Sequence, residues 1–305
     1  MDEKNKVLVI FHRVDFDGIV SGSIVKKTAM DAGEKVTILG WNYSDKLPNV
    51  SELIDNFKTI VMVDISFPPE EMIKLKESGK LIWIDHHHTA IENSEKYGYS
   101  DAPGIRLIGT AACELTWKFF FGEDFECPLI IQYCSAYDTW NKSRFSWDEE
   151  TLPIQYSLRS EYGLDFNKFF KDFPSIVETP EVINYFLVNG RSIIKYLKSA
   201  WEGQTKVYSF PVKVAGKYKG VCLLSPQSSS AAFDCVKDLF DIYIVANKKG
   251  DSYSISLYKE PDRIPEFNLA DYLASIAPGA GGHASACGGM LTEKQFIHLV
   301  TKNEI

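Results

Sequence analysis

Short apolar runs alternate with amphipathic stretches along the first half of the chain. Four runs rich in Val and Ile, bounded by polar residues or Gly, predict strands: residues 7–11, 35–40, 59–63 and 81–84. Three stretches between these runs have the apolar periodicity of helices: residues 19–32, 51–57 and 69–78. Strands that alternate with helices indicate βαβ units, which form a parallel sheet with right-handed crossovers.

The pattern changes along the second half. Three further helices are predicted, at residues 109–121, 128–137 and 181–200. Four strands and two helices follow them: strands at 206–214, 219–224, 242–247 and 253–259, and helices at 269–276 and 293–302. The last helix begins with a capping box, in which the side chains of Thr292 and Gln295 satisfy end amides.

These elements predict an α/β protein with two lobes. The N-terminal lobe, residues 1–180, has a parallel sheet with helices on both faces. A linker helix at residues 181–204 leads to a smaller C-terminal α/β lobe with a mixed sheet, residues 205–305. A chain of 305 residues is long enough for two such domains.

Net charge and hydrophobicity limit the cellular compartment and the binding partners expected for the chain. The 33 Lys+Arg and 41 Asp+Glu give a net charge of −8, which argues against a protein that coats long DNA. No apolar run approaches the roughly 18 residues of a membrane span, and the run at 7–11 is too short for a signal peptide. We therefore expect a cytoplasmic protein with no membrane partner. One short basic segment has four lysines and no acidic residue between positions 205 and 233: Lys206, Lys213, Lys217 and Lys219.

Polar residues follow three of the predicted strands directly. They are His12, Asp15 and Asp17, then Asp64, then Asp85, His86, His87 and His88, with Asp138 at the end of a helix. In an open parallel sheet these strand ends border one ligand crevice. Imidazoles and carboxylates without thiolates suit Mn²⁺ or a related metal. The carboxylates would repel one another if left bare, so two cations that activate a water for phosphoryl displacement are the natural complement.

Each motif alone has an ordinary structural interpretation. His12 could be a hydrogen-bonded loop residue, residues 15–18 could form a turn, and Asp64 could cap a helix that follows Pro68. Three consecutive histidines directly after a buried strand are harder to explain as scaffold. The joint pattern therefore predicts a metal centre.

The same residues resemble the four motifs of the DHH phosphoesterase superfamily: His12-x-x-Asp15-x-Asp17-Gly18, Asp64, Asp85-His86-His87 and Asp138. Gly281-Gly282-His283 is similar to the glycine-rich segment of its DHHA1 domain. The resemblance points to the RecJ-like, oligoribonuclease (nanoRNase)-like branch, with a DHH catalytic domain at 1–180 and a DHHA1-like substrate-binding domain at 205–305.

The resemblance also implies residue roles. One metal would be held by His12, Asp15 and Asp64, and the other by Asp17, Asp64, His86 and Asp138. Asp85 would orient an imidazole, and His87 would stabilise the scissile phosphate or donate a proton. His88 has no role in the family pattern.

The glycine-rich segment has two interpretations. Gly281, Gly282 and His283 could bind a substrate phosphate or a terminal nucleotide, or they could follow a helix as a flexible turn. Tyr258 stands where the family often has an Arg, and three basic residues are left open as substitutes: Lys259, Arg263 and Arg191. The patch at residues 140–147 could stack on bases or cover the sheet.

We therefore expect a Mn²⁺-dependent phosphodiesterase, with Mg²⁺ or Co²⁺ as substitute metals, that hydrolyses short oligonucleotides or dinucleotides to mononucleotides. The substrate would sit between the lobes. One alternative is a phosphomonoesterase for a bisphosphate nucleotide or a polyphosphate or pyrophosphate hydrolase. Another is a nucleotide sensor without turnover. The oligomeric state is open, and a homodimer is compatible with the sequence.

Overall fold

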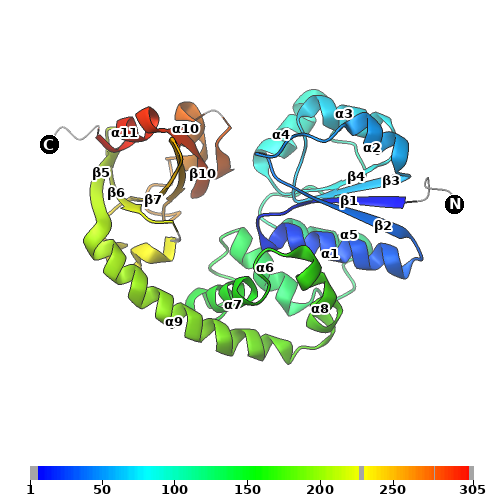
Figure 1. Cartoon of the computed structure of the whole chain (residues 1–305), viewed down its shortest axis with the longest axis horizontal. Coiled ribbons are helices and arrows are strands. Elements are labelled where there is room, and N and C mark those ends of the chain that lie inside the picture. Colours follow the sequence, from blue (N-terminus) through cyan, green and yellow to red (C-terminus); the bar gives the residue numbers. More distant parts are fainter. Residues whose placement is uncertain (1–5, 227–229, 278, 302–305) are drawn as a thin grey trace. The chain divides into compact units, whose positions relative to one another are not determined.

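The computed structural model describes residues 6–226, 230–277 and 279–301. The chain divides into two compact units, Met1–Ile194 and Lys195–Ile305. The division falls within one long helix, α9 (Val182–Tyr208), which is drawn in green in Figure 1. Each unit has its own sheet and its own hydrophobic core.

The first unit is built on a four-stranded sheet in the order β2-β1-β3-β4. Its strands are β1 (Lys6–His12), β2 (Lys35–Trp41), β3 (Thr59–Val63) and β4 (Leu81–Ile84). All three pairings are parallel, which confirms the predicted sheet. The register aligns Phe11 with Val63 and Val63 with Ile84. Three neighbouring strands therefore end at the same level.

Helices cover both faces of this sheet, as predicted. Figure 1 shows α2, α3 and α4 on one face and α1 and α5 on the other. The helices of the unit that precede α9 are α1 (Phe16–Asp31), α2 (Val50–Asn56), α3 (Pro69–Glu77), α4 (His88–Tyr97), α5 (Ala112–Phe121), α6 (Leu129–Asp138), the π-helix η1 (Trp147–Thr151), α7 (Leu152–Tyr162) and α8 (Phe166–Glu178).

The apolar runs of the sequence arise because the central strands are buried on both faces. In β1, Val9 packs into one cluster with Ile19 of α1, and Ile10 packs into the other with Leu75 of α3. All four side chains are fully buried. Burial of each such side chain contributes about 1.5–3 kcal/mol, which fixes the strand and therefore the position of its C-terminal end.

The second unit has a six-stranded sheet in the order β5-β6-β7-β8-β10-β9, and the expected mixed sheet is confirmed, although only four of its strands were predicted. Within the described residues, β6 and β7 pair in parallel and the other neighbours are antiparallel. Its elements after α9 are β5 (Ser209–Val214), β6 (Tyr218–Leu224), the 3₁₀-helix η2 (Ser230–Val236), β7 (Ile242–Lys249), β8 (Ser252–Tyr258), α10 (Leu269–Ile276), β9 (Gly281–His283), β10 (Ala286–Thr292) and α11 (Glu293–Thr301).

The capping box of α11 is confirmed. The backbone N–H of Thr292 donates to Oε1 of Gln295 at 2.8 Å, and the N–H of Gln295 donates to Oγ1 of Thr292 at 3.3 Å. The predicted end of this helix at Lys302 lies outside the described residues.

The structure differs from the predicted elements at several places. Residues 206–208 were expected to begin a strand, but they form the last turn of α9, where the Lys206 ammonium pairs with Glu202 at 2.6 Å, one turn earlier. Such i,i+4 pairs favour a helix. Residues 281–283 and 286–292 were not predicted as strands, and they form β9 and β10, which pair with each other. Helices α4, α7 and α8 were not predicted either.

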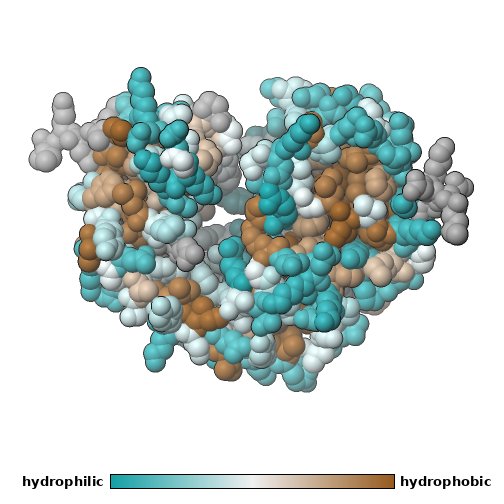
Figure 2. Space-filling model, in the orientation of Figure 1, coloured by the Kyte–Doolittle hydropathy of each residue, from teal (hydrophilic) through white to brown (hydrophobic). Residues whose placement is uncertain are grey.

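Hydrophilic and apolar residues are interspersed on the visible surface of each unit (Figure 2). On the edge strand β2, Val36, Ile38 and Leu39 remain only half-buried.

Among the helices that the structure describes, none has an apolar stretch long enough to span a membrane.

Candidate metal centre

The ends of three adjacent strands supply the polar side chains of the site. His12 is the last residue of β1, Asp64 directly follows β3, and Asp85 directly follows β4. Asp15 caps helix α1, because its Oδ1 accepts a hydrogen bond from the N–H of Gly18 at 2.9 Å. Strand order and register therefore bring side chains together that lie more than 70 positions apart in the sequence.

Gly18 allows the close approach of α1 to the end of β1. A Cβ atom at this position would lie 1.9 Å from the carbonyl oxygen of His12. Only glycine fits here without a backbone shift. The Asp15-x-Asp17-Gly18 motif thus has a packing requirement in addition to its carboxylates.

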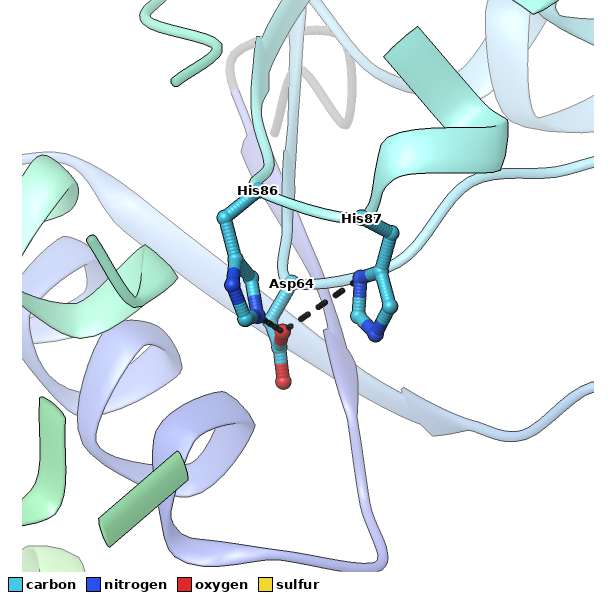
Figure 3. Close-up of side chains that lie close together, drawn as sticks. All are labelled: Asp64, His86 and His87. Carbon is cyan, nitrogen blue, oxygen red and sulfur yellow. Dashed lines mark ion pairs between the residues drawn. The ribbon is translucent and has the colours of Figure 1, made fainter. Parts of the chain in front are cut away.

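His86 lies at the centre of three carboxylates. Its Nε2 is 3.3 Å from Oδ1 of Asp64, 3.4 Å from Oδ2 of Asp17 and 3.2 Å from Oδ2 of Asp138. Figure 3 shows that His86 and His87, from the segment after β4, both face the same oxygen of Asp64. The Nδ1 atom of His87 is 3.8 Å from that oxygen.

A second group forms on the other side of Asp64. Nδ1 of His12 is 2.8 Å from Oδ2 of Asp15 and 3.6 Å from Oδ2 of Asp64. Asp64 therefore turns one oxygen toward His12 and the other toward His86. The arrangement matches a carboxylate that bridges two ligand groups.

Asp64 itself is placed under strain. Its backbone φ is +60°, in the left-handed region that residues other than glycine seldom adopt. Its side chain is fully buried, and neither carboxylate oxygen accepts a hydrogen bond from the described part of the chain. A buried carboxylate without donors is costly. A cation between the two groups would remove that cost, so the residues fit a metal.

The pKa values of Asp64 and Asp138 also favour a bound cation. Burial raises the pKa of Asp64 well above its ordinary range, and the charges of Asp17 and Asp15 raise it further. Burial, with Asp17 next, raises the pKa of Asp138 to about 7. Asp138 is also the last residue of α6, where the helix dipole disfavours a negative charge. These carboxylates would ionise readily only beside added positive charge.

His12 supplies part of that charge when no metal is bound. Burial lowers the pKa of His12, but its close contacts with Asp15 and Asp64 and their negative charges outweigh burial and raise the pKa to about 11. The imidazolium thus occupies the position of a cation between two carboxylates.

Asp17 has partners that its sequence position does not reveal. Its Oδ2 accepts a hydrogen bond from the N–H of Ala112 at 2.9 Å, and its Oδ1 accepts one from Cys113 at 2.6 Å. These are the first two residues of α5. Each carboxylate oxygen has two lone pairs, so Asp17 can hold α5 and still ligate a cation beside His86.

Asp85 contacts His87 and the backbone around it. Its Oδ1 lies 2.7 Å from Nδ1 of His87 and accepts hydrogen bonds from the N–H groups of His86 and His87 at 2.7 and 3.1 Å. The side chain of Asp85 is fully buried. The imidazole that Asp85 orients is therefore that of His87. His88 lies apart from this cluster on the exposed start of α4, where its Nδ1 is 3.3 Å from Glu92.

Asn42 also belongs to the site, although it was not among the predicted residues. Asn42 directly follows strand β2, and its Oδ1 lies 3.1 Å from Nε2 of His12. The signal was present, because a polar residue directly after a strand marks the same sheet edge as His12 and Asp64.

Comparison with known proteins identifies this arrangement. Residues 6–135 match the family model described as the DHH family, N-terminal domain. This part of the chain therefore carries the N-terminal domain of the DHH family. A search among curated proteins finds no match.

Solved structures resemble the fold of both units. The chain resembles RecJ from Thermus thermophilus, in complex with Mn²⁺, at 14% identity and a TM-score of 0.54. That match covers 96% of this chain and 50% of RecJ, so this chain spans half the length of that relative. It also resembles the DHH domain of a member of the S1p family of ribosomal proteins, at 13% identity and a TM-score of 0.63, over 97% of this chain and 85% of the other.

The predicted substrate residues lie in the second unit. Gly281, Gly282 and His283 form the edge strand β9, so the segment is a strand and not a flexible turn after α10. Gly282 pairs with Cys287 and has a φ of +136°, and a Cβ atom there would lie 2.7 Å from the carbonyl oxygen of Ala286.

The three basic residues left open as substitutes for the family Arg each have internal contacts. Lys259 is buried and donates to the carbonyl oxygen of Ile264 at 2.8 Å. Arg263 donates to Asp241 at 3.1 Å. Arg191, in the first unit, donates to the carbonyl oxygen of Glu149 at 3.0 Å. None of these contacts singles out one of them as a phosphate ligand.

The aromatic patch after Asp138 packs largely on itself. Trp147 stacks on Tyr137 with ring centroids 5.8 Å apart and lies 5.0 Å from Trp140. The Lys142 ammonium lies 4.9 Å from the centroid of Trp140. These contacts order the segment that follows Asp138.

Proposed function

We propose that this DHH-family chain is a phosphodiesterase that uses two Mn²⁺ ions to hydrolyse short oligonucleotides or dinucleotides to mononucleotides. The observation that carries the proposal is the carboxylate of Asp64. It is buried, lacks hydrogen-bond donors within the described residues, and turns one oxygen toward each ligand group. A bridging carboxylate of this kind is the central ligand of a two-metal site.

The two groups define the ligand sets. His12, Asp15 and Asp64 would hold one cation, and the other would be held by Asp17, Asp64, His86 and Asp138. Mg²⁺ or Co²⁺ would be accepted as substitutes, since oxygen and imidazole ligands suit them also. When bound, the ions supply a Lewis acid for the phosphate oxygens and lower the pKa of a water nucleophile.

His87 would act on the substrate. Asp85 holds its Nδ1 at 2.7 Å, and the dashed contact with Asp64 in Figure 3 uses the same nitrogen, so neither contact involves Nε2. Burial lowers the pKa of His87, but the charge and hydrogen bond of Asp85 raise it above its ordinary value. The raised pKa favours the protonated ring, which would donate a proton to the departing oxygen or stabilise the phosphate.

Charge on the surface supports a short substrate. The net charge is −8, and two of the four lysines at 206–219 pair with acids: Lys206 with Glu202 at 2.6 Å and Lys217 with Glu266 at 3.8 Å. Long nucleic acids need many uncompensated cations.

The proposed organisation is a DHH catalytic domain at residues 1–180, a linker helix at 181–204 and a DHHA1-like domain at 205–305. In this proposal Gly281, Gly282 and His283 bind the far end of the substrate.

Product analysis with a substrate panel tests the proposal. The purified chain would be incubated with Mn²⁺ and an RNA dinucleotide, a long single-stranded DNA, a cyclic dinucleotide, a 3′,5′-bisphosphate nucleotide or polyphosphate. We expect mononucleotides from the dinucleotide, lost in His86→Ala and retained in His88→Ala, because His86 faces the carboxylates of the site and His88 lies apart from them. Phosphate released from the bisphosphate nucleotide or polyphosphate alone would replace the proposal with a monoesterase or polyphosphatase. Nucleotide binding without turnover would replace the proposed function with that of a nucleotide sensor.

A further inference from the structure

Asn42 contacts the one nitrogen of His12 that faces away from the carboxylates. Its Oδ1 is 3.1 Å from Nε2, whereas Nδ1 of the same ring lies 2.8 Å from Asp15 and 3.6 Å from Asp64. The two edges of the imidazole are thus assigned to different partners, an amide on one side and the carboxylate cluster on the other.

A compact turn holds Asn42 in this position. The N–H of Asp45 donates to the carbonyl oxygen of Asn42 at 2.8 Å, and the N–H of Asn42 donates to Oδ2 of Asp45 at 2.9 Å. Nδ2 of Asn42 donates to Oγ of Ser44 at 2.9 Å. That contact uses the amide nitrogen, so the carbonyl oxygen is the atom turned toward His12.

The turn is fastened to the strand that carries His12. Arg13 forms a two-pronged pair with Asp45, with Nε and Nη2 at 2.9 and 2.7 Å from the two carboxylate oxygens. The N–H of Arg13 also donates to the carbonyl oxygen of Trp41 at 3.2 Å. His12 and Asn42 therefore lie at the ends of neighbouring strands. The contacts of Arg13 hold these two strand ends together.

The chemistry of the two partners sets the protonation of the ring. An amide oxygen only accepts hydrogen bonds, so the nitrogen that faces it carries a proton. In the neutral ring the lone pair is then on Nδ1. We propose that Asn42 is a positioning residue, which keeps His12 with Nε2 protonated and the Nδ1 lone pair directed at the cation that Asp15 and Asp64 would share.

This inference rests on the proposed metal site and adds a residue that acts through a ligand. Partners of a ligating imidazole fix its tautomer and orientation, and their loss typically costs about 10- to 100-fold in metal affinity. The Arg13–Asp45 pair is half-exposed, so its contribution to global stability is small. The network is therefore expected to affect metal affinity much more than unfolding.

Metal titration of matched variants tests the inference. Asn42→Leu keeps the size of the side chain and removes the acceptor, Asn42→Asp keeps an acceptor, and Ser44→Ala removes only the other partner of the amide. By isothermal titration with Mn²⁺, we expect Asn42→Leu to raise the dissociation constant about 10- to 100-fold. Asn42→Asp and Ser44→Ala should bind as the wild type does. Thermal melts in EDTA check that all variants fold.

A measurement without metal separates this inference from the proposed function. In ¹⁵N-labelled protein, the Nε2 proton of His12 should give a protected signal in the wild type and in Asn42→Asp, and lose protection in Asn42→Leu. Equal Mn²⁺ affinity of Asn42→Leu and wild type would overturn the inference while leaving the metal site intact. A wild type that binds no Mn²⁺ would overturn the metal site, and the Nε2 signal would still decide whether Asn42 holds the ring.

Discussion

The carboxylate of Asp17 accepts a hydrogen bond from the backbone N–H of Ala112, 95 positions later in the chain, at 2.9 Å. With the second bond, from Cys113 at 2.6 Å, it satisfies two of the amides that every helix leaves open at its N-terminus. A residue of the candidate metal centre thus also holds α5 against the start of α1.

This double role predicts a stability loss that is independent of metal. Asp17→Ala leaves two buried N–H groups without their acceptor, so the free energy of unfolding in EDTA should fall by about 1–3 kcal/mol. Urea unfolding followed by tryptophan fluorescence measures it. Asp138→Ala is the matched control, because Asp138 belongs to the same cluster but faces His86. Equal losses in the two variants would contradict the capping role.

Asp138 should instead make the metal-free protein less stable as the pH rises. Its pKa is raised to about 7, so the folded state loses stability as the pH climbs from the unfolded value near 4 to about 7. Asp138→Asn removes this cost. In EDTA at pH 8 we expect the variant to gain on the order of 1 kcal/mol over the wild type, with the gain shrinking toward pH 4. A wild type that is the more stable of the two at pH 8 would contradict the account.

The Asp85–His87 contact predicts a change in the pH profile of activity. Since the charge and hydrogen bond of Asp85 raise the pKa of His87, Asp85→Asn should lower it. The alkaline limb of the kcat profile should then move to lower pH, because His87 loses its proton earlier. His88→Ala, which alters the exposed neighbour, should leave the limb in place. An unchanged limb in Asp85→Asn would remove His87 from the role of proton donor.

Gly18 provides a test of packing at the site. Gly18→Ala would place a methyl group 1.9 Å from the carbonyl oxygen of His12, and overpacking of this kind costs about 1–3 kcal/mol or more. Gly203, in α9, has no atom within 4 Å of an added Cβ, so Gly203→Ala should be neutral or stabilising by up to about 1 kcal/mol. Thermal melts of both variants decide the point. A Gly18→Ala variant as stable as Gly203→Ala would show that α1 can move.

The parallel sheet is predictable from the sequence because its strands are buried on both faces, which produces unbroken apolar runs such as residues 59–63. The convergence of His12, Asp64 and Asp85 follows, since each comes directly after a run. Asn42 also comes directly after a strand. That strand lies at the edge of the sheet, its apolar run ends in Trp41, and Asn42 belongs to no familiar motif. The contact of Asp17 with α5 depends on tertiary packing, so no local pattern indicates it.

For two other elements, the local sequence pattern does not indicate the structure that forms. Residues 88–97 form α4 although they carry few apolar residues, because the helix lies on the surface and buries only Ala90 and Ser94 fully. The strand β9 contains two glycines and three residues in all, and it exists only through pairing with β10. Both elements are stabilised by neighbours that a linear pattern does not contain.

The most direct test of the account is the effect of Asp64→Asn on diester hydrolysis. Asn has nearly the shape of Asp and also tolerates the left-handed backbone at this position, so the fold should persist, while the bridging charge is lost. We predict that the initial rate of mononucleotide release from an RNA dinucleotide in Mn²⁺ falls at least about 10³-fold, with melting in EDTA unchanged or raised. A folded Asp64→Asn variant that hydrolyses the dinucleotide at the wild-type rate would contradict the central claim.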